Sequence, residues 1–231
     1  MTDIHHRRDR HRRLAWTHAA LAGSFLLALG QTGPVWSQDA AAACQGGGLD
    51  RAAIARCSTL LGSGTLQGEG LARAAEWRMG AHFATGDYVN AAYDADIYAN
   101  LWPDLLLGYY VGCLARGAGG FDLDTAERLC ETAMRLTDDP SVFSVRGILR
   151  LKQNRNQDAW ADFDRHLQAS PRTAQAAYGR GIAAMRLGRV SEGRADIAAA
   201  ADMDREMNLT DPQMFTTEQF YTAWGLVPPQ R

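Results

Sequence analysis

Small residues recur along the middle of the chain at a nearly constant spacing. Ala91, Ala126, Ala159 and Gly193 lie 35, 33 and 34 residues apart. Large apolar residues accompany them at helical spacing, as in the stretches 143–167 and 178–197. A period near 34 residues is typical of arrays of stacked helix pairs. The pattern therefore predicts a solenoid in which each unit contacts only its neighbours, rather than a single globular core.

Helix-breaking residues divide this repeat into helices. Residues 86–87, 154–156 and 188–189 separate the two helices of a unit, and Pro103, Pro140 and Pro171 separate successive units. A further joint is expected near Gly120. Glycine inside a helix costs about 1 kcal/mol relative to alanine, so a glycine at a fixed repeat position indicates close packing. We therefore expect the first helices of two units, at Gly147 and Gly181, to lie against Ala159 and Gly193.

The pattern resembles the tetratricopeptide repeat. Residues 178–204 look like a nearly complete unit, and residues 86–103 look like the second half of another. The resemblance covers residues 66–205 and implies an all-α, right-handed superhelical solenoid of about four helix–turn–helix repeats. The second unit carries an insertion at residues 117–122 and is also similar to the related Sel1-like form, whose inter-helix loops are longer.

Both flanks of the repeat region contain one more helical pattern. Residues 49–62, inside the N-terminal segment 38–65, predict a capping helix. Residues 215–224, inside the C-terminal segment 206–231, predict a closing helix followed by a short tail. A solenoid exposes the apolar face of its terminal units, so the expected role of both helices is to cover those faces.

The first 37 residues have a different composition. Five arginines and three histidines precede an uncharged, mostly apolar stretch at residues 14–29, which is typical of a signal peptide cleaved before Gln38. The stretch is shorter than the roughly 20 residues that span a bilayer. A twin-arginine signal at Arg12-Arg13 and a lipidation box ending at Cys44 are weaker alternatives. We expect a periplasmic or secreted protein without stable membrane insertion after cleavage.

Removing the leader changes the charge. Without its five arginines and two aspartates, 19 basic and 24 acidic residues remain, a formal charge of −5 that argues against a nucleic-acid partner. Lys152 is the one lysine among 24 basic residues, which we interpret as the coding bias of a GC-rich bacterial genome.

The four cysteines lie in the mature chain, and an even number is typical of disulfides in an oxidising compartment. Three connectivities are possible. We favour the local pairs Cys44–Cys57 and Cys113–Cys130, because the second pair lies on the two helices of one hairpin. There is no Cys-x-x-Cys pair, and His82 and His166 are isolated, so no metal site is expected.

The sequence offers little for catalysis. Ser63 lies between two glycines in a turn between helices, without the strand-to-helix geometry of a nucleophile elbow. The glycine clusters 46–48 and 117–120 lack the lysine of a phosphate-binding loop. Neighbouring aspartates, such as Asp122 and Asp124, point different ways on a helix and more often cap it or face solvent. We therefore predict neither an enzyme nor a cofactor.

The resemblance implies that the concave face, lined by the first helix of each repeat, binds a protein or peptide. The positions that face this groove in the family are apolar, aromatic and basic here: Arg78, Tyr109, Ser144, Ile148, Lys152, Gln175, Tyr178, Ile182 and Arg186. Such a lining suits a segment with apolar anchors and some acidic residues. The alternative is that Ile148 and Ile182 pack between helices.

These observations predict an exported, non-catalytic scaffold that binds a protein partner through its groove. Two other functions fit the same sequence. One is a structural or assembly subunit of a cell-envelope complex that docks by its convex surface, and the other is a periplasmic chaperone-like binder of unfolded segments.

Overall fold

The computed structural model describes residues 44, 48–208 and 216–229, and the predicted signal peptide lies outside these ranges. The described residues form helices and contain no strand: α3 (Arg51–Gly62), α4 (Gly68–Ala84), α5 (Tyr88–Leu101), α6 (Leu106–Gly119), α7 (Leu123–Leu136), α8 (Ser141–Lys152), α9 (Asn156–Ala169), α10 (Ala174–Arg186), α11 (Val190–Asn208) and α12 (Thr217–Ala223). Within these ranges, none of the helices combines the length and the apolar character needed to cross a bilayer.

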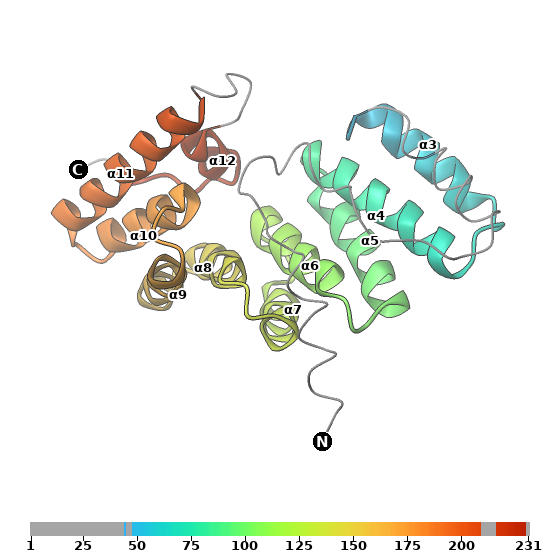
Figure 1. Ribbon diagram of the computed structural model, residues 1–231, viewed down its shortest axis with the longest axis horizontal. Coiled ribbons are helices and arrows are strands. Elements are labelled where there is room, and N and C mark those ends of the chain that lie inside the picture. Colours follow the sequence, from blue (N-terminus) through green and yellow to red (C-terminus); the bar gives the residue numbers. More distant parts are fainter. Residues whose placement is uncertain (1–43, 45–47, 209–215, 230–231) are drawn as a thin grey trace, which may run out of the picture.

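The helices pair into four hairpins that stack in chain order. The pairs are α4/α5, α6/α7, α8/α9 and α10/α11, and each packs on the next, while α3 packs on α4 (Figure 1). The result is the predicted all-α solenoid. The stack is arched, and α12 lies on its inner side, in contact with α10 and α11 (Figure 1).

The hairpin turns carry the repeat most regularly. Gly86, Gly120, Asn154 and Gly188 follow one another at intervals of 34 residues, and each has a positive φ, between 58° and 82°. In each turn the following N–H bonds back to a carbonyl five residues earlier, as in Arg155 to Arg150 at 2.8 Å and Arg189 to Ala184 at 2.9 Å. This is the Schellman ending of a helix, which needs a left-handed residue. The predicted joints at 86, 120, 154 and 188 are therefore confirmed.

The second hairpin departs from the expected insertion. Residues 117–119 continue α6, and the extra residue lies after Gly120. As a result α7 begins three residues past the turn glycine, whereas the other second helices begin two residues past it. Gly117 packs on α8: a β-carbon there would lie 3.6 Å from Leu149 Cα, an ordinary contact distance. This single residue explains the spacings of 35 and 33 on either side of Ala126.

When residues are numbered from the turn residue of each hairpin, equivalent positions on the two helices contact each other in successive hairpins. Gly147 packs against the ring of Phe163, and Gly181 against Ile197 and the backbone oxygen of Gly193. The expected close approach is present at Gly181 and Gly193, whereas at Gly147 the nearest atoms belong to Phe163 and not to Ala159. A large side chain on the second helix fills the space left by the glycine on the first.

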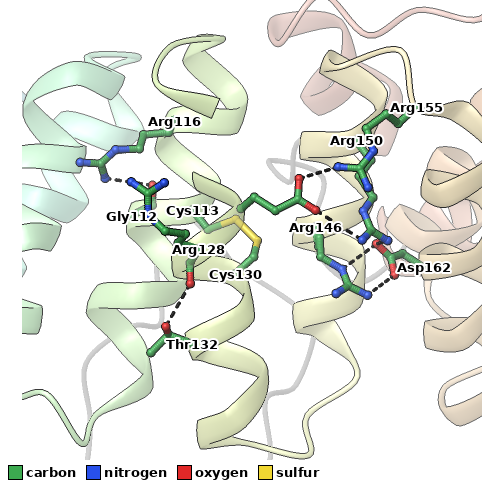
Figure 2. The surroundings of a disulfide bond; sticks show 11 residues. Gly112, Cys113, Arg116, Arg128, Cys130, Thr132, Arg146, Arg150, Arg155 and Asp162 are labelled. Carbon is green, nitrogen blue, oxygen red and sulfur yellow. Dashed lines mark hydrogen bonds and ion pairs between the residues drawn. A yellow bond between two sulfur atoms is a disulfide. The ribbon is translucent and has the colours of Figure 1, made fainter. Parts of the chain in front are cut away.

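In the second hairpin the same two positions hold Cys113 and Cys130. They form a disulfide between α6 and α7, with the Cα atoms 5.4 Å apart (Figure 2). The other pair, Cys44–Cys57, joins the segment before α3 to α3, with the Cα atoms 5.0 Å apart. Both are the local pairs favoured from the sequence.

An arginine–aspartate pair joins the two helices of the other three hairpins. The pairs are Arg78–Asp94, Arg146–Asp162 and Arg180–Asp196, each 16 residues apart and bonded through two oxygens at 2.6–3.0 Å. The second hairpin has Gly112 and Leu129 at the equivalent places, in contact with each other. The disulfide therefore cross-links the one described hairpin that lacks the ion pair. Figure 2 shows it beside the Arg146–Asp162 pair of the next hairpin.

Candidate partner-binding groove

The inner side of the arch presents a surface that we call the groove, formed by Phe83, Tyr88, Lys152, Gln175 and Tyr178, with Arg186 beside Lys152. These residues come from α4, α5, α8 and α10, and so from the first, third and fourth hairpins. The groove is not empty. Residues 216–229, which we call the C-terminal segment, lie in it and share one apolar cluster with Phe83, Tyr88 and Tyr178.

Tyr221 is the deepest residue of the C-terminal segment, with 0% of its surface exposed. Its hydroxyl donates to the backbone oxygen of Gln175 at 2.9 Å, and its ring centroid lies 5.1 Å from that of Tyr178. A β-carbon on Gly179 would approach the Tyr221 Oη to 2.3 Å. The surface of α10 therefore accommodates this phenol closely, because position 179 has no side chain.

Trp224 extends the contact to the first hairpin. Its Nε1 donates to the Tyr88 hydroxyl at 2.9 Å, and its ring lies edge-on to Phe83, with the centroids 6.4 Å apart. Its backbone oxygen accepts a hydrogen bond from Lys152 Nζ. Only 3% of Trp224 and 2% of Leu226 are exposed. The segment thus connects hairpins that the stack itself keeps apart.

Local sequence explains the shape of the C-terminal segment. Thr216 and Gln219 form a capping box that starts α12. Gly225 has a φ of 67°, and the N–H of Leu226 bonds to the carbonyl of Tyr221 at 2.9 Å, which ends the helix after two turns. Thr217 anchors the start of α12 on α11 by two hydrogen bonds to the buried Asp204 carboxylate, at 2.7 and 2.8 Å.

The groove has an uncompensated positive charge. Within the described ranges, Lys152 and Arg186 have no carboxylate within ion-pair distance, and each donates to a backbone oxygen, of Trp224 and of Leu151. Burial lowers the pKa of both side chains, and the neighbouring charge of Arg186 lowers the pKa of Lys152 further. Two half-buried cations that bond only to carbonyls favour an added anion.

Tyr178 contributes an uncharged ring to the contact with the C-terminal segment. Burial, and secondarily the charge of Glu218 on α12, raise the pKa of Tyr178 to about 12. Tyr178 is therefore a neutral phenol at any physiological pH and packs as an apolar ring.

The structure places the residues expected to line the groove in three different settings. Lys152, Gln175, Tyr178 and Arg186 lie in the groove or at its edge. Ile148 and Ile182 are buried in the apolar cluster that also holds Tyr178, Tyr221 and Trp224. Ser144 is also buried, and its hydroxyl lies 2.5 Å from His166 Nδ1 on the other helix of its hairpin.

The register of the first two hairpins needs correction. Counted from the turn residues, the positions equivalent to Ser144 and Tyr178 are Glu76 and Tyr110, where the family pattern suggested Arg78 and Tyr109. Arg78 is held by Asp94 inside its own hairpin. The turn residues, which lie at intervals of 34, give this register directly.

Sequence reading missed the inner partners Phe83, Tyr88, Tyr221 and Trp224. The closing helix was expected to cover the last unit only. The spacing Phe220-Tyr221-x-x-Trp224, three aromatics on one helix face, is the signal that could have revealed a buried helix.

Among the described residues there is no group of three side chains that could hold a metal ion. The one serine–histidine contact described above, Ser144 with His166, is closed to a substrate because both side chains are buried between α8 and α9.

Comparisons with known proteins identify the fold. No protein-family model matches the chain, and no curated protein matches it in sequence. Solved structures of MamA are similar. The structure of MamA 41-end from Desulfovibrio magneticus RS-1 aligns with a TM-score of 0.59 at 13% identity, over 74% of this chain and 94% of that chain.

Two further MamA structures agree. A MamA RS-1 double mutant aligns with a TM-score of 0.58 at 12% identity, over 75% of this chain and 95% of the other, and a MamA crystal structure with 0.54 at 14%, over 68% and 90%. At these identities the likeness concerns the backbone arrangement alone. The chain therefore has the fold of a tetratricopeptide-type solenoid.

Proposed function

We propose that this chain is an exported, non-catalytic scaffold that binds a protein or peptide partner through its inner groove. One observation carries the proposal: the groove already holds a peptide segment, with Tyr221 fully buried and its hydroxyl bonded to the α10 backbone. A surface that buries an amphipathic helix of its own chain has the apolar pockets and donors that helix recognition requires.

Export is proposed from the leader and the cysteines. A basic, then apolar N-terminus predicts a signal peptide, and two cysteine pairs at bonding distance fit a periplasmic or secreted location. The formal charge of −5 on residues 38–231 favours a protein over a nucleic acid as partner.

The test is a charge reversal inside the groove. The mature protein carrying Lys152→Glu with Arg186→Glu is compared with wild type in crosslinked affinity capture from the native envelope. We expect recovery of the partner to fall at least about tenfold, which corresponds to about 1.4 kcal/mol. Arg128→Glu, an exposed position on α7, is the matched control and should leave capture unchanged. Equal capture of the partner by wild type, the groove variant and the control would exclude the groove as the binding surface.

Docking by the outer surface is the second candidate, because α5 carries two exposed apolar side chains one turn apart. Val89 is 63% and Tyr93 62% exposed. Tyr93→Ala in the same capture experiment separates the two functions: loss of partner with this variant, and not with the groove variant, would favour an assembly subunit that docks through α5.

A further inference from the structure

The C-terminal segment occupies the place that an external peptide needs. Tyr221, Trp224 and Leu226 fill the groove, and the close fit of Tyr221 against Gly179 leaves no space for a second side chain. A partner and this segment therefore exclude one another.

The segment is held by tertiary contacts more than by its own helix. α12 has 7 residues, and helices of that length are marginal in water on their own. Its attachments are the aromatic contacts with Phe83 and Tyr178 and the hydrogen bonds of Tyr88, Lys152, Gln175 and Asp204. When these contacts are lost, only the capping box of Thr216 and Gln219 and the Leu226–Tyr221 bond remain to hold α12 in a helix.

A linked segment competes at a high effective concentration, of the order of millimolar for a short connection. A partner that displaces it must gain a contact that the segment does not make. Lys152 and Arg186 offer that contact. The segment gives Lys152 only the Trp224 carbonyl, Arg186 donates to the Leu151 carbonyl of α8, and no carboxylate of the described residues pairs with either. A carboxylate adds the attraction between opposite charges, which a carbonyl oxygen does not supply, and this attraction is screened less at half-buried groups than in water.

From these contacts, we propose that the C-terminal segment is an internal ligand of the groove and that the partner displaces it with a helical segment of related chemistry. That partner segment presents two adjacent aromatics, a third aromatic three residues on, and a helix end followed by an acidic residue. The acidic residue binds Lys152 and Arg186. The inference rests on the proposed function and names the partner's chemistry.

The test uses two synthetic peptides as probes and the mature full chain. One peptide has the sequence of residues 216–229, and the other carries Val227→Asp. Fluorescence anisotropy measures their binding to wild type, to Tyr221→Ala with Trp224→Ala, and to Thr222→Ala as the control on the exposed side of α12.

We expect both peptides to bind the doubly substituted protein at least tenfold more tightly than wild type or the control. The acidic peptide should bind at least threefold more tightly than the other, and Lys152→Gln with Arg186→Gln should remove that difference. If the doubly substituted and wild-type proteins bind the peptides with equal affinity, the proposal that the segment is an internal ligand is wrong. If the two peptides bind with equal affinity, the proposal that an acidic residue of the partner binds Lys152 and Arg186 is wrong.

A second measurement covers the case in which the double substitution unfolds the chain. Hydrogen exchange of residues 217–226 in wild type is followed while the acidic peptide is added. Faster exchange there, with unchanged exchange in α8 and α10, supports displacement, and unchanged exchange at saturating peptide contradicts it. The two proposals can also be separated. If neither peptide binds, but charge reversal at Lys152 and Arg186 still abolishes capture of the native partner, partner binding in the groove is supported and the internal-ligand proposal is wrong.

Discussion

Trp224 and Tyr88 are 136 residues apart in the chain, and the indole Nε1 of Trp224 donates a 2.9 Å hydrogen bond to the Tyr88 hydroxyl. This bond links the closing segment of the solenoid to its first hairpin. Within the described residues, the helices on either side of the bond belong to opposite ends of the stack (Figure 1). The arch is therefore closed by contacts that a linear array of repeats does not contain.

Tyr88→Phe tests this closure. The substitution removes only the hydroxyl and leaves the buried Trp224 Nε1 without its acceptor, which costs about 1–3 kcal/mol. We expect a lower thermal midpoint and faster hydrogen exchange in residues 217–226. Tyr93→Phe, at an exposed position, should change the free energy of unfolding by less than about 0.5 kcal/mol. Equal effects of the two substitutions would contradict the closure.

Asp162→Ala tests the ion pair of the third hairpin. The buried Asp162 carboxylate accepts from both Arg146 and Arg150, at 2.6–3.0 Å. Its removal leaves two half-buried guanidinium groups without that partner, and we expect a loss of about 3–5 kcal/mol in urea unfolding. Asp158→Ala removes the exposed partner of Arg155 and should cost less than about 1 kcal/mol.

Cys113→Ala with Cys130→Ala tests the cross-link of the second hairpin. The disulfide closes a loop of 17 residues, which in the chain-entropy model contributes roughly 3 kcal/mol. The equivalent hairpins retain an arginine–aspartate pair, but this one has Gly112 and Leu129 instead. We expect hydrogen exchange to increase most in α6 and α7. Unchanged exchange in α6 and α7 would contradict a stabilising role for this disulfide.

Glu76→Gln tests a buried carboxyl on α4. Burial raises the pKa of Glu76 from 4.5 to about 7, partly offset by the charge of Arg73. Because the folded state then binds this proton more tightly than the unfolded state, its contribution to stability is full below pH 4.5 and is lost as the pH rises through 7. The variant lacks this loss, so its urea midpoint should exceed that of wild type by more at pH 8 than at pH 5. A gap independent of pH would show that Glu76 titrates normally.

Much of the solenoid was predictable because its determinants are local. Each hairpin turn needs a residue tolerant of positive φ, and Gly86, Asn154 and Gly188 mark those turns in the sequence. The arginine–aspartate pairs were predictable in the same way, since a spacing of 16 residues recurs with the repeat, although sequence reading did not use it. The signal peptide and the exported location stay predictions.

The contents of the groove depended on the tertiary structure. The sequence of residues 216–226 determines a capped helix with one aromatic face, but not the surface that this face covers. That choice depends on Tyr88, Lys152 and Gln175, which come from three different hairpins and meet only after the stack has curved. Helix caps and turns are determined by neighbours in the chain, whereas burial of an aromatic face depends on the distances between hairpins, which the packing of the whole solenoid decides.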